Sequence, residues 1–233
     1  MDKTNTIKAP FFEIGPKAYL YGDAVIDLAK AADEASKKYD VDIIFTTPYV
    51  SIADVRRATD RLHVFAPHMD PIRPGRGLTD ILPESLVAAG AEGVMLNHIE
   101  HPLGIHLLHE TIDRAKEVGL ATIVCTDASV EAAMVAHLAP DIIVAEPSEL
   151  IGTGQTVGPA YVEAAVGAVR TVDPSILVLV AAGIHDGDDV YRMIKAGADA
   201  TGTSSGIAAA DDPAAMVDEM IGAVRRAYDE RQS

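Results

Sequence analysis

The chain has 233 residues, of which 48% are hydrophobic, and its 19 basic and 35 acidic side chains give a formal net charge of −16. This composition predicts a folded protein with a substantial core and excludes a disordered or fibrous chain. The acidic balance and the scattered Lys and Arg residues exclude a nucleic-acid partner. An anionic ligand would therefore depend on local backbone N–H groups rather than on the net charge.

The cysteine content and the N-terminus predict the compartment. Cys125 is the single cysteine, so an internal disulfide is excluded and a reduced, cytoplasmic setting is favoured. No apolar run approaches the ~20 residues that a membrane span needs, and residues 1–5 do not lead into a signal-peptide core. We expect a cytoplasmic protein with no membrane partner.

Short apolar segments recur along the chain, and each is typical of a parallel strand that is covered on both faces. The eight segments are residues 11–14, 41–45, 62–66, 93–96, 121–125, 142–145, 177–181 and 198–201. Segments with helical periodicity lie between them, for example residues 23–38 and 157–172. In the first of these the apolar face comprises Val25, Leu28, Ala29, Ala32 and Ala35.

Two later helices carry signals at their ends. Residues 186–195 begin with acidic side chains and end before Gly197, as a helix does when its first turn is acidic and a glycine follows its last turn. The pair Asp212-Pro213 is typical of an N-cap residue followed by a proline at the first helical position.

Eight alternations of strand and helix, without a linker or a break in composition, predict a closed α/β barrel of the (β/α)8 type. We expect residues 1–233 to form a single domain. An open doubly wound sheet is the alternative, and it usually has a glycine-rich turn after its first strand. Here the first strand runs into Gly15-Pro16-Lys17, which is not a dinucleotide-binding motif.

Barrel enzymes assemble their sites at the carboxyl ends of the strands, so the residues that follow each predicted strand are site candidates. Lys17, His98 and Glu146 follow the first, fourth and sixth strands. Turns rich in Gly and Ser follow the seventh and eighth strands, at residues 182–184 and 202–206. The sequence therefore predicts one rim on which these three side chains face two turns that bind an anion.

Glu146 ends an apolar run, and the segment after it closes on Gly152-Thr153-Gly154, which is typical of a mobile lid. A glutamate can remove a proton from carbon, a histidine can polarise the adjacent carbonyl, and a lysine can stabilise the negative charge that develops. This combination predicts the interconversion of an aldose and a ketose in a site that closes against water.

Simpler interpretations exist for the same residues. Lys17 is also compatible with a surface lysine, and Glu100 with the N-cap of the following helix. His98 is compatible with a metal site that includes other histidines, although no tight ligand pattern is present. The turn at residues 202–206 is compatible with a plain connection between strand and helix.

Several segments resemble the triosephosphate isomerase family, and more closely its shorter archaeal-type branch, over nearly the whole chain. Glu146-Pro147-Ser148-Glu149-Leu150-Ile151-Gly152-Thr153-Gly154 resembles the catalytic glutamate and lid of that family. Leu96-Asn97-His98-Ile99-Glu100 is similar to its strand-four motif, which carries an electrophilic histidine. Supporting matches are residues 70–75, Ala182-Gly183-Ile184 and Ser205-Gly206.

The resemblance implies specific roles. Glu146 would be the base, His98 the electrophile and Lys17 the substrate-binding lysine. The expected phosphate-binding residues are Gly152, Gly183, Ser204, Ser205 and Gly206. The substrate would be a small phosphorylated sugar, with glyceraldehyde 3-phosphate and dihydroxyacetone phosphate as the default pair. Members of the family use no metal or organic cofactor and assemble as homodimers or, in the archaeal-type branch, as homotetramers.

The sequence also departs from the family pattern. The family has Asn-x-Lys where this chain has Gly15-Pro16-Lys17, so an amide that contacts a substrate oxygen is absent. Ile99, His101 and Pro67 replace the family's serine, arginine and glutamine. Two alternatives therefore stay open: an isomerase of a longer phosphorylated ketose such as a tetrulose phosphate, and a barrel that binds a phosphorylated metabolite without turning it over.

Overall fold

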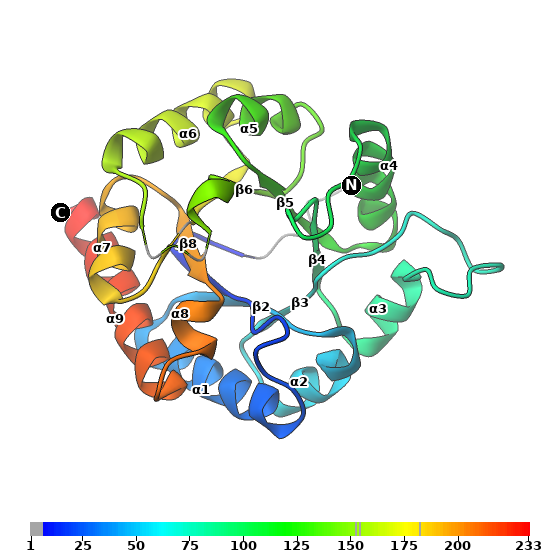
Figure 1. Cartoon of the computed structure of the whole chain (residues 1–233), viewed down its shortest axis with the longest axis horizontal. Coiled ribbons are helices and arrows are strands. Elements are labelled where there is room, and N and C mark those ends of the chain that lie inside the picture. Colours follow the sequence, from blue (N-terminus) through cyan, green and yellow to red (C-terminus); the bar gives the residue numbers. More distant parts are fainter. Residues whose placement is uncertain (1–6, 152, 154, 182) are drawn as a thin grey trace.

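The computed structural model describes residues 7–151, 153, 155–181 and 183–233, and its parallel strands close into a barrel in the order β1 to β8. The strands are β1 Phe11–Ile14, β2 Asp42–Thr46, β3 His63–Ala66, β4 Gly93–Leu96, β5 Ala121–Thr126, β6 Ile142–Ala145, β7 Leu177–Val180 and β8 Ala200–Thr203. Figure 1 looks down the barrel and shows the helices arranged around it. The prediction of a closed (β/α)8 barrel is confirmed.

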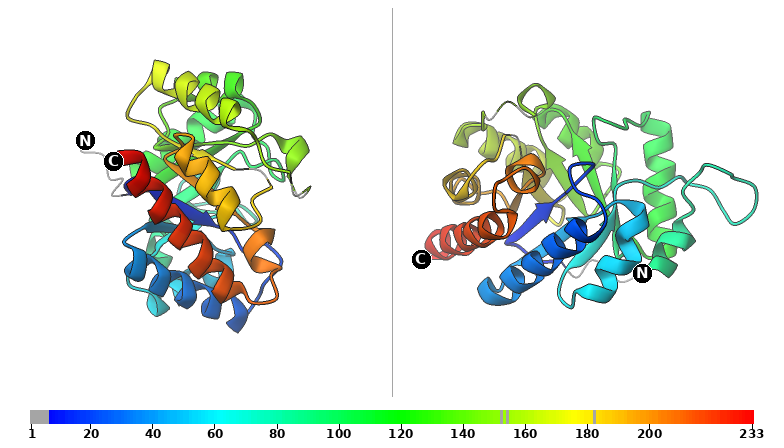
Figure 2. Two further views of the ribbon diagram at one scale, coloured as in Figure 1. Left: turned by 90° about the vertical axis from the view of Figure 1, so that its left-hand side faces the viewer. Right: turned by 60° about the horizontal axis from the view of Figure 1, so that its bottom comes forward.

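The helices follow the strands in turn. They are α1 Asp23–Tyr39, α2 Ile52–Ala58, α3 Pro83–Ala89, α4 Ile105–Val118, α5 Ser129–Ala136, α6 Pro159–Val172, α7 Gly187–Lys195, α8 Ser205–Ala208 and α9 Pro213–Gln232, with the 3-10 helices η1 Tyr49–Ser51 and η2 Ser148–Leu150. The short helix α8 directly follows β8, and α9 then packs between α7 and α1 (Figure 2). None of the helices in the described part of the chain is both long and apolar enough to cross a membrane.

The predicted helix signals are confirmed at the two capped ends. The Asp186 side chain accepts a hydrogen bond from the Asp189 N–H at the start of α7, and the Asp212 side chain accepts one from the Ala215 N–H at the start of α9. Such caps satisfy backbone donors that have no partner within the helix. The predicted apolar face of α1 is also buried as a whole.

The position of β8 differs from the prediction of 198–201. Phe11 of β1 is paired with Ala200, so β8 begins two residues later than the apolar pattern indicates. Asp199 lies before the strand, where its carboxylate accepts hydrogen bonds from the Val178 N–H at 2.9 Å and from Arg170 at 2.8 Å. Asp199 is itself buried, and its contacts with β7 and α6 place it before the first paired residue of β8, which the hydrophobicity of the segment does not reveal.

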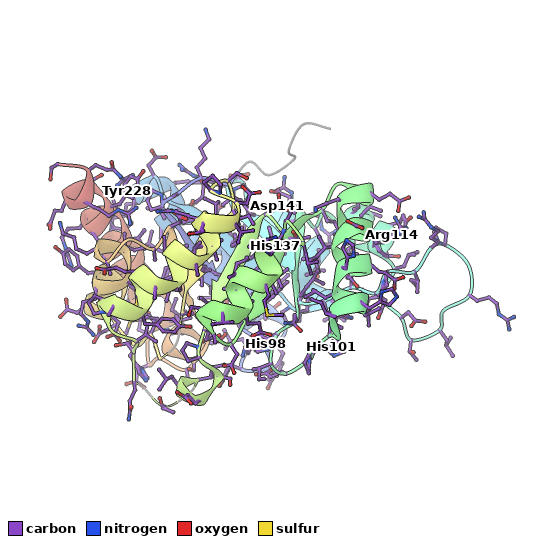
Figure 3. All side chains as sticks on the ribbon, turned by 90° about the horizontal axis from the view of Figure 1, so that it is seen from above. His98, His101, Arg114, His137, Asp141 and Tyr228 are labelled. Carbon is purple, nitrogen blue, oxygen red and sulfur yellow. The ribbon has the colours of Figure 1, made fainter. Side chains whose placement is uncertain are left out.

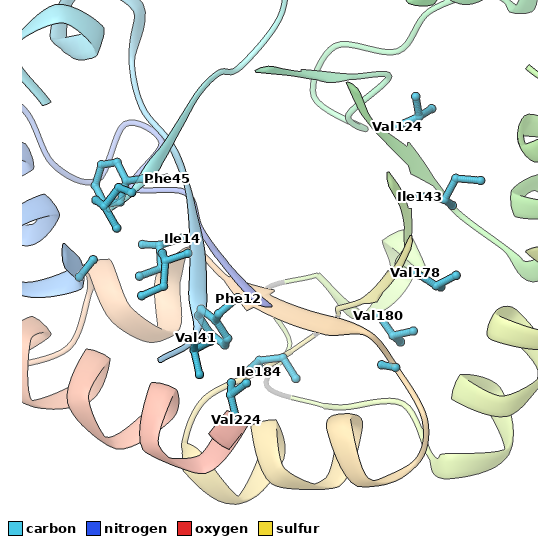
Figure 4. Packing of buried hydrophobic residues seen from close by; sticks show 14 of the residues in the cluster. Phe12, Ile14, Val41, Phe45, Val124, Ile143, Val178, Val180, Ile184 and Val224 are labelled. Carbon is cyan, nitrogen blue, oxygen red and sulfur yellow. The ribbon is translucent and has the colours of Figure 1, made fainter. Parts of the chain in front are cut away.

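The core has two layers because side chains alternate along each strand. Phe12 and Ile14 of β1 belong to the outer layer, between the strands and the helices, where Figure 4 also shows Val224 of α9. Phe11 belongs to the inner layer, which is built almost entirely from strand residues and fills the barrel. Glu13 lies on the same face of β1 as Phe11, so a carboxyl group is directed into the barrel interior.

Asp33 of α1 fixes the turn that leads into β3. Its side chain is only 3% exposed, and its Oδ1 accepts hydrogen bonds from the N–H groups of Asp60, Arg61 and Leu62 at 3.1, 2.7 and 3.2 Å. Lys37 lies 2.7 Å from its other oxygen. Burial by itself raises the pKa of Asp33, but these hydrogen bonds outweigh that effect and lower it below its ordinary value.

We expect Asp33→Ala to lower the free energy of unfolding at pH 7 by about 2–3 kcal/mol, because three backbone donors lose their acceptor. A carboxyl whose pKa is lower in the folded protein stabilises it above the unfolded-state pKa, and this contribution is lost as the pH falls through the folded value. The difference from wild type should therefore shrink towards about pH 3. Urea unfolding at both pH values measures this, with Asp27→Ala on the exposed face of α1 as the control.

Candidate functional site

A cavity of about 1070 Å³ opens at the carboxyl ends of the strands, and Lys17, His98 and Glu146 all line it. The three side chains that the sequence predicts to share a rim therefore meet at one site. Gly183, Ser204 and Ser205 also line the cavity, whereas Gly152 lies outside the described residues. Figure 3 shows His98 and His101 at one end of the barrel and Asp141 at the other, consistent with a site confined to the carboxyl end.

Lys17 follows β1 and has a left-handed backbone with φ 45°. This conformation is costly for a residue with a side chain, and such residues often occur at functional sites. The Lys17 Nζ lies 2.9 Å from Glu100 Oε1 and 3.2 Å from His98 Nε2. Lys17 is therefore not a surface lysine, and Glu100 does not cap the next helix, because Gly104 occupies the N-cap of α4.

The protonation of His98 follows from its contacts. Its Nδ1 accepts a hydrogen bond from the Glu100 N–H at 3.1 Å, which favours the tautomer with the hydrogen on Nε2. The approach of Lys17 Nζ to Nε2 at 3.2 Å is then a contact between two donors and not a hydrogen bond. Burial lowers the pKa of His98, and the charge of Lys17 lowers it further against the opposite effect of Glu100. The imidazole is thus neutral near pH 7 and presents a hydrogen-bond donor to the cavity.

Asn97 anchors the loop that carries His98. Its backbone is left-handed with φ 58°, its Nδ2 donates to the Cys125 carbonyl at 2.9 Å, and its Oδ1 accepts from the Leu103 N–H at 2.9 Å. One side chain thereby ties the β4–α4 loop to the end of β5. This bracing holds the imidazole in place, as a preorganised donor requires.

Glu146 follows β6 directly, and its N–H donates to the Thr126 carbonyl at 3.0 Å. The side chain is half-buried, and burial raises its pKa above the ordinary value. Lys17 acts in the opposite direction, and Glu100 adds a smaller increase. A carboxylate whose pKa moves towards neutrality is a stronger base than a solvated one.

The turns after β7 and β8 are packed too closely for side chains. Gly183 has φ 62°, and a Cβ there would lie 2.3 Å from the Gln155 carbonyl oxygen. A Cβ on Gly206 would lie 2.5 Å from the Ile184 carbonyl oxygen. The Thr203 hydroxyl donates to that same Ile184 oxygen at 2.9 Å and accepts from the Gly206 N–H at 3.2 Å, so the two turns are joined.

The remaining histidines lie on several elements: His63 on β3, His68 after β3, His101 after β4, His106 and His109 on α4, His137 after α5 and His185 after β7. His68 and His101 have ring centroids 4.2 Å apart at the cavity edge. His106 and His109 pair instead with acidic residues one turn further along α4. Across the described residues, no group of three or more His, Cys, Asp or Glu side chains is arranged to hold a metal ion.

Glu13 is a cavity residue that the sequence interpretation missed. The sequence did indicate it, because Glu13 interrupts an otherwise apolar strand. It lies two residues after Phe11 and therefore on the same face of the strand. The sequence interpretation includes Glu100 in the motif at the end of the fourth strand but gives it no role other than a possible helix cap, whereas in the structure it contacts Lys17.

A parallel eight-stranded barrel with a lysine, a neutral histidine and a half-buried carboxylate in one cavity at its carboxyl end defines an enzyme of the (β/α)8 barrel class. The sequence profile of the triosephosphate isomerase family matches residues 16–220. The chain belongs to that family and is an isomerase.

The alignments with individual relatives cover nearly the full length of this chain and of each relative. Triosephosphate isomerase from Saccharolobus solfataricus is 36% identical over 225 residues, which is 95% of this chain and 99% of the relative. The protein of the same name from Sulfurisphaera tokodaii is 33% identical over 231 residues, covering 97% and 100%. That from Methanopyrus kandleri is 35% identical over 221 residues, covering 92% and 98%.

Proposed function

We propose that the chain interconverts glyceraldehyde 3-phosphate and dihydroxyacetone phosphate by proton transfer through an enediolate, with Glu146 as the base. The observation that carries this proposal is the meeting of Lys17, His98 and Glu146 in one cavity. The family membership supports the same reaction type, since the relatives are named triosephosphate isomerase.

The proposed reaction assigns one task to each side chain. The Glu146 carboxylate takes the proton from the carbon next to the carbonyl, and the C–H electron pair becomes the carbon–carbon double bond of the enediolate. The negative charge that forms on the carbonyl oxygen is stabilised by the His98 Nε2–H and by the Lys17 cation. The hydroxyl proton on the carbon that lost its hydrogen moves to the former carbonyl oxygen, with His98 carrying it between the two oxygens. Glu146 returns its proton to the former carbonyl carbon, which gives the isomeric product without net change in the enzyme.

In this proposal the phosphoryl group of the substrate binds at the two joined turns after β7 and β8. Gly183, Ser204 and Ser205 line that part of the cavity. Gly206 does not line the cavity, but the close packing of Gly183 against Gln155 and of Gly206 against Ile184 fixes the backbone of both turns. Oriented backbone N–H groups hold phosphate well even in a protein whose net charge is negative.

A substrate panel tests this proposal. Purified protein is assayed with triose, tetrose and pentose phosphates, and we expect turnover of the triose phosphates with the highest kcat/KM. A shift in melting temperature with 2-phosphoglycolate, which resembles the enediolate, measures binding independently of turnover. Binding without turnover of any sugar phosphate would contradict the proposed reaction and support the alternative of a non-catalytic barrel.

One observation favours a longer phosphorylated ketose as the second candidate. Gly15 places no side chain at the end of β1, and the cavity it lines has a volume of about 1070 Å³, slightly above the usual range for small-molecule sites. The panel decides between the two candidates, because preference for a tetrulose phosphate over the triose phosphates would replace the first proposal by the second. Assembly as a homodimer or homotetramer in the cytoplasm is part of either proposal, and light scattering measures the oligomeric state.

A further inference from the structure

Glu13 is buried in the wall of the cavity without a hydrogen-bonding partner for one of its oxygens. The residue is only 8% exposed, yet it lines the cavity together with Lys17 and Glu146. Its Oε1 is fully buried and makes no hydrogen bond within the part of the chain that is described. Native proteins rarely leave a buried polar atom in this state, because desolvation without a partner is costly.

Two glycines make room for this carboxyl group. A Cβ on Gly15 would lie 3.2 Å from Glu13 Oε1, and a Cβ on Gly202 would lie 3.2 Å from Glu13 Oε2 and 2.9 Å from the Glu13 Cβ. The carboxyl group thus fills the space that side chains at the ends of β1 and β8 would occupy. Both glycines line the same cavity, so the carboxyl group is directed at its contents.

The part of the cavity wall formed by the end of β2 also contains buried hydroxyl groups. Thr46 and Thr47 at the end of β2 also line the cavity. The Thr47 hydroxyl oxygen is buried without a hydrogen-bonding partner among the described residues, whereas the Thr46 hydroxyl lies close enough to the Glu13 carboxyl to lower its pKa. Glu13 Oε1 and the Thr47 hydroxyl are thus two buried polar atoms of one cavity without a protein partner, as expected of a wall that hydrogen-bonds to a ligand.

We propose that Glu13 is a further substrate-binding residue, whose protonated carboxyl donates a hydrogen bond to an oxygen on the carbon chain of a hydroxy-carbonyl phosphate, beside the Thr46 hydroxyl. This inference rests on the proposed function, because it assigns a contact to the same substrate. It also explains how a chain with glycine at position 15 retains a polar group beside the reacting carbons.

The charges around Glu13 support its protonated form. Burial raises its pKa to about 7, while Thr46 and Lys17 lower the pKa and Glu146 raises it. The other ionisable neighbour is Cys125, whose thiol has a raised pKa because it is buried. When the pH rises through about 7, Glu13 loses its donor and adds a negative charge beside the developing enediolate. Ligand affinity should therefore fall on the alkaline side.

Glu13→Gln and Glu13→Leu test this inference. Glutamine keeps the shape and a donor but does not ionise, whereas leucine removes the donor. The readouts are the dissociation constant of 2-phosphoglycolate, obtained from melting-temperature shifts at pH 6 and pH 8, and the pH profile of kcat/KM. Glu163→Gln, which removes an exposed carboxylate on α6, is the matched control.

We expect wild type and the control to bind up to about tenfold more weakly at pH 8 than Glu13→Gln does, with little difference at pH 6. Glu13→Leu should bind about 10- to 100-fold more weakly at both pH values. Equal pH dependence in wild type and Glu13→Gln would overturn the inference, and that comparison stands even if the leucine variant fails to fold.

The outcome separates this inference from the proposed function. Turnover of triose phosphates by wild type, with the same pH profile in Glu13→Gln, refutes only the role of Glu13. Glu13-dependent binding of 2-phosphoglycolate without turnover of any sugar phosphate refutes only the proposed reaction. A wild-type protein that neither turns over nor binds these compounds refutes both.

Discussion

Glu146→Gln should lower kcat for triose phosphate isomerisation by about 10³-fold, because the amide cannot take the proton from carbon. The pKa of Glu146 is raised mainly by burial, so the carboxylate is a stronger base than a solvated one. Below that pKa the wild-type base is protonated, and kcat should fall with decreasing pH. Coupled assays of kcat and KM across pH 5–9 measure both effects.

Glu149→Gln is the matched control for this variant. Glu149 lies three residues further along, on η2, and its side chain is exposed, so the same charge is removed from the same loop. We expect its kcat to stay within about twofold of wild type. Equal losses in both variants would show that the charge of the loop matters and that Glu146 is not the base.

Lys17→Met should have the second largest effect, a loss of about 10²–10³-fold in kcat/KM. The variant removes the cation that would stabilise the enediolate and leaves Glu100 without its partner at 2.9 Å. Lys17 lowers the pKa of Glu146, so its removal should also raise the pKa that governs the acidic side of the kcat/KM profile. The pH optimum should therefore move upward as the rate falls.

Lys30→Met, an exposed lysine on α1, has the same change in net charge and serves as the control. The pH profile of kcat/KM for Lys30→Met should match that of wild type, because exposed charges outside the cavity are screened by solvent and salt. An unchanged acidic pKa in Lys17→Met would mean that the cation does not act on Glu146. A loss of activity confined to KM would restrict Lys17 to ground-state binding.

The architecture could be predicted from the sequence because its physical causes are local. Most strands contain an apolar run, the long helices have a buried face, and Asp186 and Asp212 mark helix starts by their own side chains. The start of β8 could not be located in this way, because it depends on the pairing of Phe11 with Ala200 across a long sequence separation. Hydrophobicity alone does not contain that register.

The site residues that could be predicted from the sequence are those that directly follow a strand. Lys17, His98 and Glu146 follow strand ends, and the barrel brings strand ends together. The pairing of Lys17 with Glu100 and the burial of Glu13 depend instead on how side chains from different strands share space. Glu13 lies within an apolar strand, where sequence reasoning expects core packing and does not look for a ligand contact.

The hydroxyl of Thr203 bridges the two turns through Ile184 and Gly206, so the anion end of the cavity behaves as one rigid piece of backbone. A change at either turn must be accommodated by the other. The wall formed by Glu13 and Thr46 consists of side chains on separate strands and can be altered one residue at a time. If the proposed phosphate site is correct, substitutions that change the preferred sugar skeleton should accumulate on that wall while the two joined turns stay unchanged.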